Sequence, residues 1–339
     1  MQNKDFVLGI DTSNYTTSLA ITDINGAIVI DSRKLLTVKQ GERGLRQSYA
    51  LFQHMENLPE MLIELFGQID KSRIGAVAAS DRPRPVEGSY MPVFKSGVNY
   101  GKVMAAGLGV PFFAFSHQEG HLAAVRRHSG LSVEEEYLAY HLSGGTCELL
   151  HVKNNDIQLL GGSKDLSFGQ VLDRIGVALG MEFPAGREMD LIALKMRDRQ
   201  ENLVPGGNQT NDHAGKAGKP TGLLKRIPID GFEINLSGIE TQCRRELEKG
   251  ADSEALIYEL FLNISDCICK LTEKAVTATG CGSVLFTGGV TASRFVRDAI
   301  GSYFGRAGKK AVITPKPVFG EPALSSDNAV GISFLGGKE

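Results

Sequence analysis

Short apolar runs alternate with longer stretches whose apolar residues recur at helical spacing, and this pattern predicts an α/β protein. In the first half of the chain we expect, in order, three strands, a helix, a strand, a helix and a strand, at residues 6–13, 18–23, 27–30, 40–69, 74–80, 97–108 and 111–115. Pro59 predicts a break or kink inside the long helix. Strands that alternate with helices indicate a parallel or mixed sheet.

The second half of the chain repeats this alternation. We expect strands at residues 137–142, 148–152, 283–290 and 311–315, and helices at 165–179, 188–197, 254–279 and 292–304. Residues 200–230 are polar and rich in Gly, Asn and Lys, which is typical of a long surface excursion.

Two hairpins carry small polar residues at their tips, at residues 11–13 and 143–145. The first tip resembles the first phosphate loop of the actin, sugar-kinase and heat-shock-chaperone (ASKHA) superfamily, although an ordinary hairpin has the same pattern. A repeated strand, polar tip and strand is what two duplicated ribonuclease-H-like domains would leave in a sequence. We therefore expect two lobes, residues 1–135 and residues 136–339.

His117 and His121 stand four residues apart in a stretch that begins with a plausible N-cap, Ser116. On a helix their side chains lie about 6 Å apart on one face, so both could reach one metal ion. The metallopeptidase pattern H-E-x-x-H has the same histidine spacing, but here Glu119 stands one residue later, turned ~100° around the helix. The position of Glu119 argues against a peptidase. Two unrelated surface histidines are the alternative.

Composition and charge limit the partners and the cellular compartment that we expect for this chain. Lys and Arg number 37 against 39 Asp and Glu, so the net charge of −2 offers no global basic field for nucleic acid. The five cysteines form no C-x-x-C pair, which fits reduced thiols. No signal-peptide pattern and no apolar run of about 20 residues occurs, so we expect a cytoplasmic protein that does not enter a membrane.

Several stretches, taken together and in order, resemble the TsaD/YgjD family, once called glycoproteases. The stretches that carry the resemblance are the loop at 9–13, H-x-E-G-H at 117–121, S-G-G at 143–145, Gly169, Asp173, Gly186, S-G at 237–238, G-G-V at 288–290 and S-D-N at 326–328. Members of that family transfer a threonylcarbamoyl group to an anticodon-loop adenosine of tRNA. The resemblance implies a two-lobed ASKHA fold.

The resemblance also implies ligands. In the family two histidines and a late aspartate hold an iron or zinc ion, and here these residues are His117, His121 and Asp327. An adenine nucleotide, either ATP or a threonylcarbamoyl-adenylate-like compound, with or without magnesium, would contact Ser143, Gly144, Gly145, Asp173, Gly186, Gly288, Gly289 and Ser293. The implied partners are tRNA and either a smaller TsaB-like relative or a second copy of the chain.

The chain departs from the family pattern at positions that bear on the ligands. Tyr15 and Thr16 replace an Asp-Glu pair, Thr146 replaces a histidine, Ser293 an asparagine and Glu240 a lysine. An Arg-Pro-Arg-Pro sequence at 82–85 replaces a glycine-rich loop. These departures therefore indicate that the chain is a divergent paralogue within the family that it resembles.

With the Asp-Glu pair absent, Asp11 is the best remaining carboxylate for a general base. The leading hypothesis is a metal- and adenylate-binding protein that transfers a threonylcarbamoyl group. The alternatives are a nucleotide-binding regulator or subunit without transfer activity, and a carbamoyltransferase of the same superfamily that acts on a small molecule.

Overall fold

The computed structural model describes residues 4–13, 15–38, 45–127, 131, 136–154, 156–202, 222–307, 313–324 and 326–339. It divides the chain into two compact units, Met1–Leu131 with Ala323–Glu339, and Ser132–Pro322. The division falls close to the boundary predicted at residue 135, but the C-terminal segment groups with the first unit. Both units are α/β, as predicted. None of the described helices is long and apolar enough to cross a bilayer.

The first unit is built on a five-stranded mixed sheet of order β3-β2-β1-β4-β5. Strands β1, β4 and β5 are parallel, and β1 pairs antiparallel with β2. The strands are β1 (Phe6–Thr12), β2 (Thr16–Asp23), β3 (Ile28–Leu35), β4 (Ile74–Arg82) and β5 (Phe112–Ser116). The central strand β1 is buried along its whole length, so its carboxyl end brings Asp11 into the interior of the unit.

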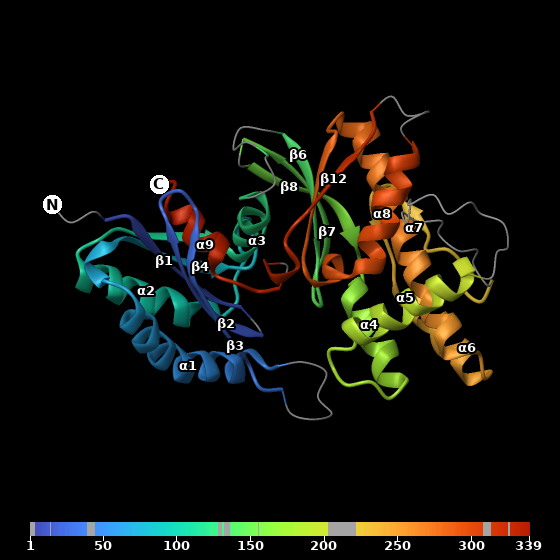
Figure 1. Ribbon diagram of the computed structural model, residues 1–339, viewed down its shortest axis with the longest axis horizontal. Coiled ribbons are helices and arrows are strands. Elements are labelled where there is room, and N and C mark those ends of the chain that lie inside the picture. The colour runs from blue at the N-terminus through green and yellow to red at the C-terminus, as the bar shows by residue number, and fades with distance from the viewer. Residues whose placement is uncertain are drawn as a thin grey trace. The chain divides into compact units, whose positions relative to one another are not determined.

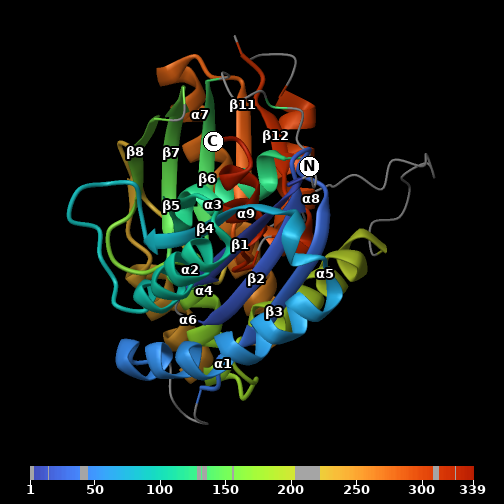
Figure 2. The same ribbon diagram turned by 90° about the vertical axis from the view of Figure 1, so that its left-hand side faces the viewer.

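Helices cover both faces of this sheet (Figures 1 and 2). They are α1 (Gln47–Gln68), η1 (Lys71–Arg73), α2 (Phe94–Leu108), α3 (His117–Arg126), η3 (Pro322–Leu324) and α9 (Val330–Gly336). Helices α1 and α2 lie on one face, where Leu58, Leu62 and Leu65 of α1 are buried against the strands. Helix α1 runs through Pro59 without the break that the sequence suggested.

Helix α9 lies on the other face and makes an unusually close approach to the sheet and to α3. A Cβ atom on Gly9 would stand 2.5 Å from the carbonyl oxygen of Ala329, and one on Gly331 would overlap the carbonyl oxygen of Gly120 at 1.8 Å. The Ser333 hydroxyl of α9 donates to the Val7 carbonyl oxygen. Because these contacts attach α9 to β1, the last residues of the chain belong to the first unit.

The second unit holds a seven-stranded sheet of order β12-β11-β6-β7-β8-β10-β9. Its strands are β6 (Tyr137–Leu142), β7 (Cys147–Lys153), β8 (Asp156–Ser163), β9 (Ile229–Asp230), β10 (Glu233–Ile234), β11 (Ser283–Thr287) and β12 (Lys316–Phe319). The last strand was expected at 311–315 but starts at Lys316, where it pairs in parallel with Ser283 of β11. Pro317 is tolerated because β12 is an edge strand.

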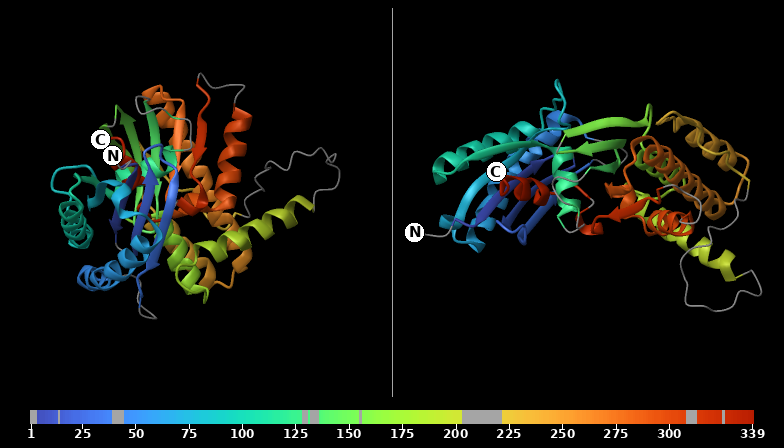
Figure 3. Two further views of the ribbon diagram at one scale, coloured as in Figure 1. Left: turned by 60° about the vertical axis from the view of Figure 1, so that its left-hand side comes forward. Right: turned by 90° about the horizontal axis from the view of Figure 1, so that it is seen from above.

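The helices of this unit gather beside the sheet, from α4 in yellow-green to α8 in red-orange (Figures 1 and 3). They are α4 (Phe168–Ala178), α5 (Gly186–Asn202), α6 (Ser237–Glu248), α7 (Ser253–Thr279), η2 (Gly289–Ala292) and α8 (Arg294–Ala307). Helix α6 and strands β8 to β10 were not expected. The predicted excursion at 200–230 lies mostly outside the described residues.

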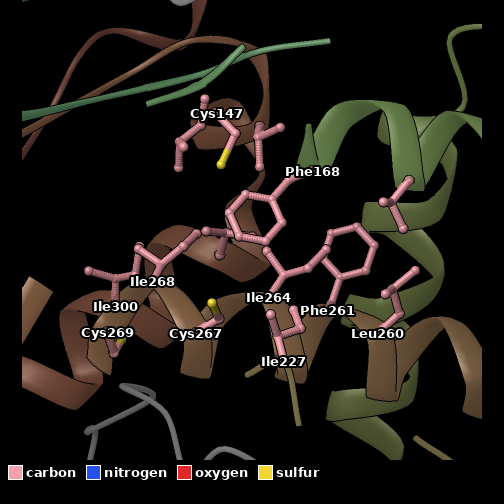
Figure 4. Packing of buried hydrophobic residues seen from close by; sticks show 14 of the residues in the cluster. Cys147, Phe168, Ile227, Leu260, Phe261, Ile264, Cys267, Ile268, Cys269 and Ile300 are labelled. Carbon is pink, nitrogen blue, oxygen red and sulfur yellow. The ribbon is translucent and has the colours of Figure 1, made fainter. Parts of the chain in front are cut away.

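Helix α7 forms the centre of the second core. Its Phe261, Ile264 and Ile268 pack with Phe168 of α4 and with Ile300 of α8 (Figure 4). Burying one such side chain contributes about 1.5–3 kcal/mol. Cys267 and Cys269 of α7 are buried in the same core and are free thiols.

Candidate functional site

Helix α3 begins at the carboxyl end of β5, and its first turn is fixed by a capping box. The Ser116 hydroxyl accepts a hydrogen bond from the Glu119 amide, and the Glu119 carboxylate accepts one from the Ser116 amide at 2.6 Å. Glu119 is therefore occupied as a helix cap. This capping role agrees with the position of Glu119 in the sequence, which argues against a peptidase-type base.

Three donor atoms converge at this helix. The Nε2 atoms of His117 and His121 lie 3.0 Å apart, and Oδ1 of Asp327 lies 3.5 Å from the first and 3.4 Å from the second. All three residues belong to the first unit, which includes Ala323–Glu339. The sequence could place the histidines together, whereas Asp327 was matched only through the family resemblance.

Two further side chains contact the triad formed by His117, His121 and Asp327. Nδ1 of His117 lies 2.9 Å from Oδ1 of Asp11, and the Ser13 hydroxyl donates to Oδ2 of Asp327 at 2.8 Å. Both supporting residues stand at the carboxyl end of β1. A carboxylate on Nδ1 fixes the ring and leaves Nε2 to face a metal ion, as is usual for metal-binding histidines.

The charges in this cluster favour a cation. Burial alone would lower the pKa of His117, but the charges and hydrogen bonds of Asp11 and Asp327 raise that pKa to about 10. Burial and the neighbouring His117 lower the pKa of His121. Burial alone would raise the pKa of Asp327, yet hydrogen bonds with both histidines hold it well below its usual range. The buried Asp11 carboxylate and the partly exposed Asp327 carboxylate thus keep positive charge on the neighbouring His117.

The donor set fits a divalent metal ion. A tetrahedral ion with ligand distances of about 2.1 Å separates its donors by about 3.4 Å, close to the three separations found. Among the described residues, the second carboxylate oxygen of Asp11 is buried and has no hydrogen-bond partner, which leaves negative charge that a nearby cation would compensate. Two imidazoles and a carboxylate suit zinc or iron and leave positions open.

A buried polar network that sequence analysis missed lies behind Ser13. His54 of α1 is fully buried, with Nδ1 2.8 Å from the Thr17 hydroxyl and Nε2 2.7 Å from the Ser13 carbonyl oxygen. The Asn57 amide donates to the same Thr17 hydroxyl. A histidine on the apolar stripe of a helix was the available signal, since a buried imidazole needs polar partners.

In the second unit, residues 143–146 form a tight turn at the end of β6. The Ser143 hydroxyl accepts hydrogen bonds from the amides of Gly145 and Thr146. The turn lies against the start of α4, where a Cβ on Gly169 would stand 2.6 Å from the Ser143 carbonyl oxygen. Space beside Gly144 and Gly145 is open, so their lack of side chains leaves the turn accessible to a ligand.

The G-G-V loop stands next to this turn. Gly288 has φ +95°, and a Cβ there would stand 2.3 Å from the Leu142 carbonyl oxygen at the end of β6. Space beside Gly289 is open. Because β6 and β11 are parallel neighbours, both glycine loops lie at the carboxyl ends of parallel strands, where α/β proteins bind ligands.

Asp173 and Gly186 also lie together. Oδ1 of Asp173 accepts a hydrogen bond from the Ala185 amide at 2.9 Å, directly before Gly186 opens α5. Burial raises the pKa of Asp173. This hydrogen bond gives Asp173 a structural role in the α4–α5 turn, in addition to the nucleotide contact that the family resemblance implies.

Ser293 is held by Asp190, a residue that sequence analysis missed. The Ser293 hydroxyl donates to Oδ1 of Asp190 at 2.5 Å, and Asp190 also accepts the amides of Arg294 and Phe295. Asp190 of α5 therefore caps the start of α8 and fixes the end of the G-G-V loop. The sequence offered only an acidic residue on a predicted helix, and such residues are too common for Asp190 to have been identified in this way.

The fold indicates the structural class to which this protein belongs. The solved structures that this chain resembles include an activator of 2-hydroxyisocaproyl-CoA dehydratase from Clostridium difficile (TM-score 0.52, 12% identity, 98% of this chain and 94% of that one). They also include a ROK family glucokinase from Streptomyces griseus (TM-score 0.51, 12% identity, 98% and 100%). At these identities the likeness shows the fold, which is the ASKHA fold.

The sequence comparisons identify the family. The family model described as tRNA N6-adenosine threonylcarbamoyltransferase, TsaD, matches residues 28–320. Curated transferases of that name include one from Archaeoglobus fulgidus, 22% identical over 97% of this chain and 90% of its own, and one from Rhodospirillum rubrum, 28% identical over 97% and 88%. The chain belongs to the TsaD family.

Proposed function

We propose that this chain binds one iron or zinc ion through His117, His121 and Asp327, and that it transfers a threonylcarbamoyl group to an anticodon-loop adenosine of tRNA. The group would come from an adenylate bound, with or without magnesium, by the glycine loops of the second unit. The convergence of three donor atoms within 3.5 Å carries the metal assignment. Family membership supports the reaction.

The reaction breaks the bond between the carbamoyl carbon and the adenylate phosphate, forms a bond to N6 of the adenosine, and releases AMP and a proton. The bound ion supplies Lewis-acid chemistry for a phosphate or carbonyl oxygen. Asp11 is fully buried and lies against Nδ1 of His117, so in this proposal it orients His117 and does not act as the general base.

The first test is metal and nucleotide content in protein purified without a metal-chelating tag. Elemental analysis should find bound iron or zinc, of which about one equivalent per chain depends on this site, and mass spectrometry an adenine nucleotide. The His117→Ala variant should lose that ion. The Glu119→Gln variant is the matched control, because it changes a carboxylate two residues away that caps the helix and should keep its metal. Equal metal content in both variants would refute the ligand set.

A regulator without transfer activity is the second candidate. Tyr15 and Thr16 stand where the resemblance implies two carboxylates, and Thr16 is a buried residue of β2 with no charge to offer. A tRNA threonylcarbamoylation assay separates the candidates. Bound metal and nucleotide without product would favour the regulator. Product on a small carbamoyl acceptor in place of tRNA would favour the small-molecule transferase.

We also propose a protein partner for the first unit, either a smaller TsaB-like relative or a second copy, in the cytoplasm. Helix α1 exposes Tyr49, Phe52, Met55 and Ile63, with Ile63 73% exposed, an apolar set that a partner could cover. The five cysteines are free and buried, in keeping with a reducing compartment. Light scattering should show a dimer, alone or with the partner, that the Phe52→Glu variant disrupts.

A further inference from the structure

A second cluster of metal-ligating side chains lies in the second unit, apart from both glycine loops. Glu136 directly precedes β6, His151 is on β7, and Cys281 stands two residues before β11. The register aligns them, because Leu138 of β6 pairs with His151 on one side and with Val284 on the other. The amino ends of β6 and β11 and the carboxyl end of β7 therefore place the three residues at one edge of the sheet.

The three side chains approach one point. Nε2 of His151 lies 2.7 Å from Oε1 of Glu136 and 3.5 Å from Sγ of Cys281. All three donor atoms lie within 4.8 Å of one another. Among the described residues, this cluster and the His117–His121–Asp327 triad are the sets of three that could hold a metal ion.

The arrangement differs from a cysteine–histidine–acid relay. In a relay the nucleophile and the acid use opposite nitrogens of the imidazole. Here Glu136 and Cys281 both approach Nε2 of His151. Convergence on one nitrogen is the geometry of groups that surround a shared cation, once the histidine proton has left.

The backbone holds Cys281 in place. Helix α7 ends at Gly280 in the left-handed conformation, with φ +78°, and the Cys281 amide donates to the Thr279 hydroxyl. Cys281 is buried, whereas His151 and Glu136 are partly exposed. An ion could therefore enter from the solvent side, where water would complete its coordination.

Lys153 completes the surroundings of the cluster. Its ammonium group lies 2.8 Å from Oε2 of Glu136. The lysine thus holds one carboxylate oxygen and leaves the other, Oε1, directed at His151. Its own side chain is 61% exposed, so it can move away from an incoming ion at little cost.

We propose that Glu136, His151 and Cys281 form a second metal site that takes one divalent ion of the zinc class. A thiolate, an imidazole and a carboxylate are the donors that zinc accepts, and the thiolate disfavours magnesium and calcium. On binding, the Cys281 thiol releases its proton to solvent and a metal–sulfur bond forms. Because its ligands lie on β7 and just before β6 and β11, the ion would connect the ends of three neighbouring strands.

The test uses cobalt(II) as a spectroscopic substitute for zinc in the full chain, stripped beforehand with a chelator. Only a cysteine ligand gives a thiolate-to-cobalt charge-transfer band in the near ultraviolet, and the first triad contains no cysteine. Titration of the wild type should develop this band to one equivalent per chain, and zinc should remove it. The His117→Ala variant should keep the band, so the result is independent of the function proposed above.

Two variants decide the ligand set. Cys281→Ser should abolish the band. Glu136→Gln, a same-sized substitution at a partly exposed position, should weaken cobalt binding at least roughly tenfold. Asp156→Asn is the matched control, a nearby carboxylate at the start of β8 that should change nothing. Absence of the band in the wild type, its persistence in Cys281→Ser, or equal affinity in Glu136→Gln and Asp156→Asn would overturn the proposal.

Discussion

Oδ1 of Asp11 lies 2.9 Å from Nδ1 of His117, and the two residues are 106 positions apart in the chain. The contact orients the His117 ring, because the Asp11 carboxylate accepts a hydrogen bond from the Nδ1–H group. Nε2 is then available beside Nε2 of His121. The carboxyl end of β1 thus orients His117 on α3. The proposed metal centre therefore depends on how β1 and α3 are positioned relative to each other.

The Asp11→Asn variant should weaken metal binding by about 10–100-fold, since the amide keeps the shape of the side chain but loses its charge. The measurement is metal affinity by competition with a chelator. Asp5→Asn is the matched control. It removes a carboxylate next to the other end of β1, where Asp5 pairs with Arg73. Equal affinities in the two variants would show that Asp11 does not support the ligand.

The Gly331→Ala variant should destabilise the protein by about 1–3 kcal/mol and lower its metal content. A methyl group there would overlap the carbonyl oxygen of Gly120 and force α9 away from α3. Asp327 precedes α9 by three residues, so it would move from the histidines. Denaturant unfolding and elemental analysis measure the two effects.

The control for this variant is Gly67→Ala, in helix α1, where a methyl group would meet nothing within 4 Å. It should leave metal content unchanged and be neutral or stabilising by up to about 1 kcal/mol. Unchanged metal content in Gly331→Ala would mean that the position of Asp327 does not depend on the packing of α9.

The local parts of the candidate site could be predicted from the sequence. The spacing of His117 and His121 placed them on one helical face, and Ser116 was recognised as the N-cap. The tertiary contacts could not be predicted from the pattern alone. Ser13 and Asp327 are 314 residues apart, and Asp11 and His117 106 apart, so their proximity depends on strand order and on α9 returning to the first unit.

The difference between local patterns and tertiary contacts also explains the errors in the predicted helices and strands. Most long strands and helices were placed within a few residues, because apolar periodicity reports burial on one face. Two ends were further off, since α1 starts at Gln47 and not at residue 40, and β3 runs to Leu35 and not to residue 30. Pro59 did not break α1, since tertiary packing on both of its sides outweighs the cost of one lost backbone hydrogen bond. The short strands β9 and β10 have two residues each, too few to show any period.

The Asp190→Ala variant should destabilise the protein by about 1–2 kcal/mol and weaken adenine nucleotide binding. It removes the acceptor for Ser293 and for the first amides of α8, so the end of the G-G-V loop loses its support. Asp252→Ala is the matched control, because Asp252 caps α7 through the Ala255 amide. The control should lose similar stability and keep its nucleotide affinity. Calorimetric titration with an adenine nucleotide distinguishes the two.

Buried His54 should make stability depend on pH. Burial lowers its pKa, so the folded protein keeps the ring neutral at pH values where the unfolded chain, with a histidine pKa of about 6.5, binds a proton. The unfolded state then binds more protons, so stability rises with pH and decreases on acidification. The contribution of neutral His54 is therefore fully present above pH of about 6.5 and is lost as the pH falls through the lowered pKa of the folded protein.

The His54→Gln variant should be less stable than the wild type by about 1–3 kcal/mol near neutral pH, because buried hydrogen bonds to Thr17 and Ser13 are lost. Below the histidine pKa this gap should narrow by up to about 1.4 kcal/mol per pH unit, since glutamine takes up no proton. Asn57→Ala removes a non-titrating member of the same network, so its gap should stay constant. Urea unfolding at several pH values measures both gaps. A His54→Gln gap that stays constant or widens on acidification would show that the wild-type ring is already protonated in the folded protein.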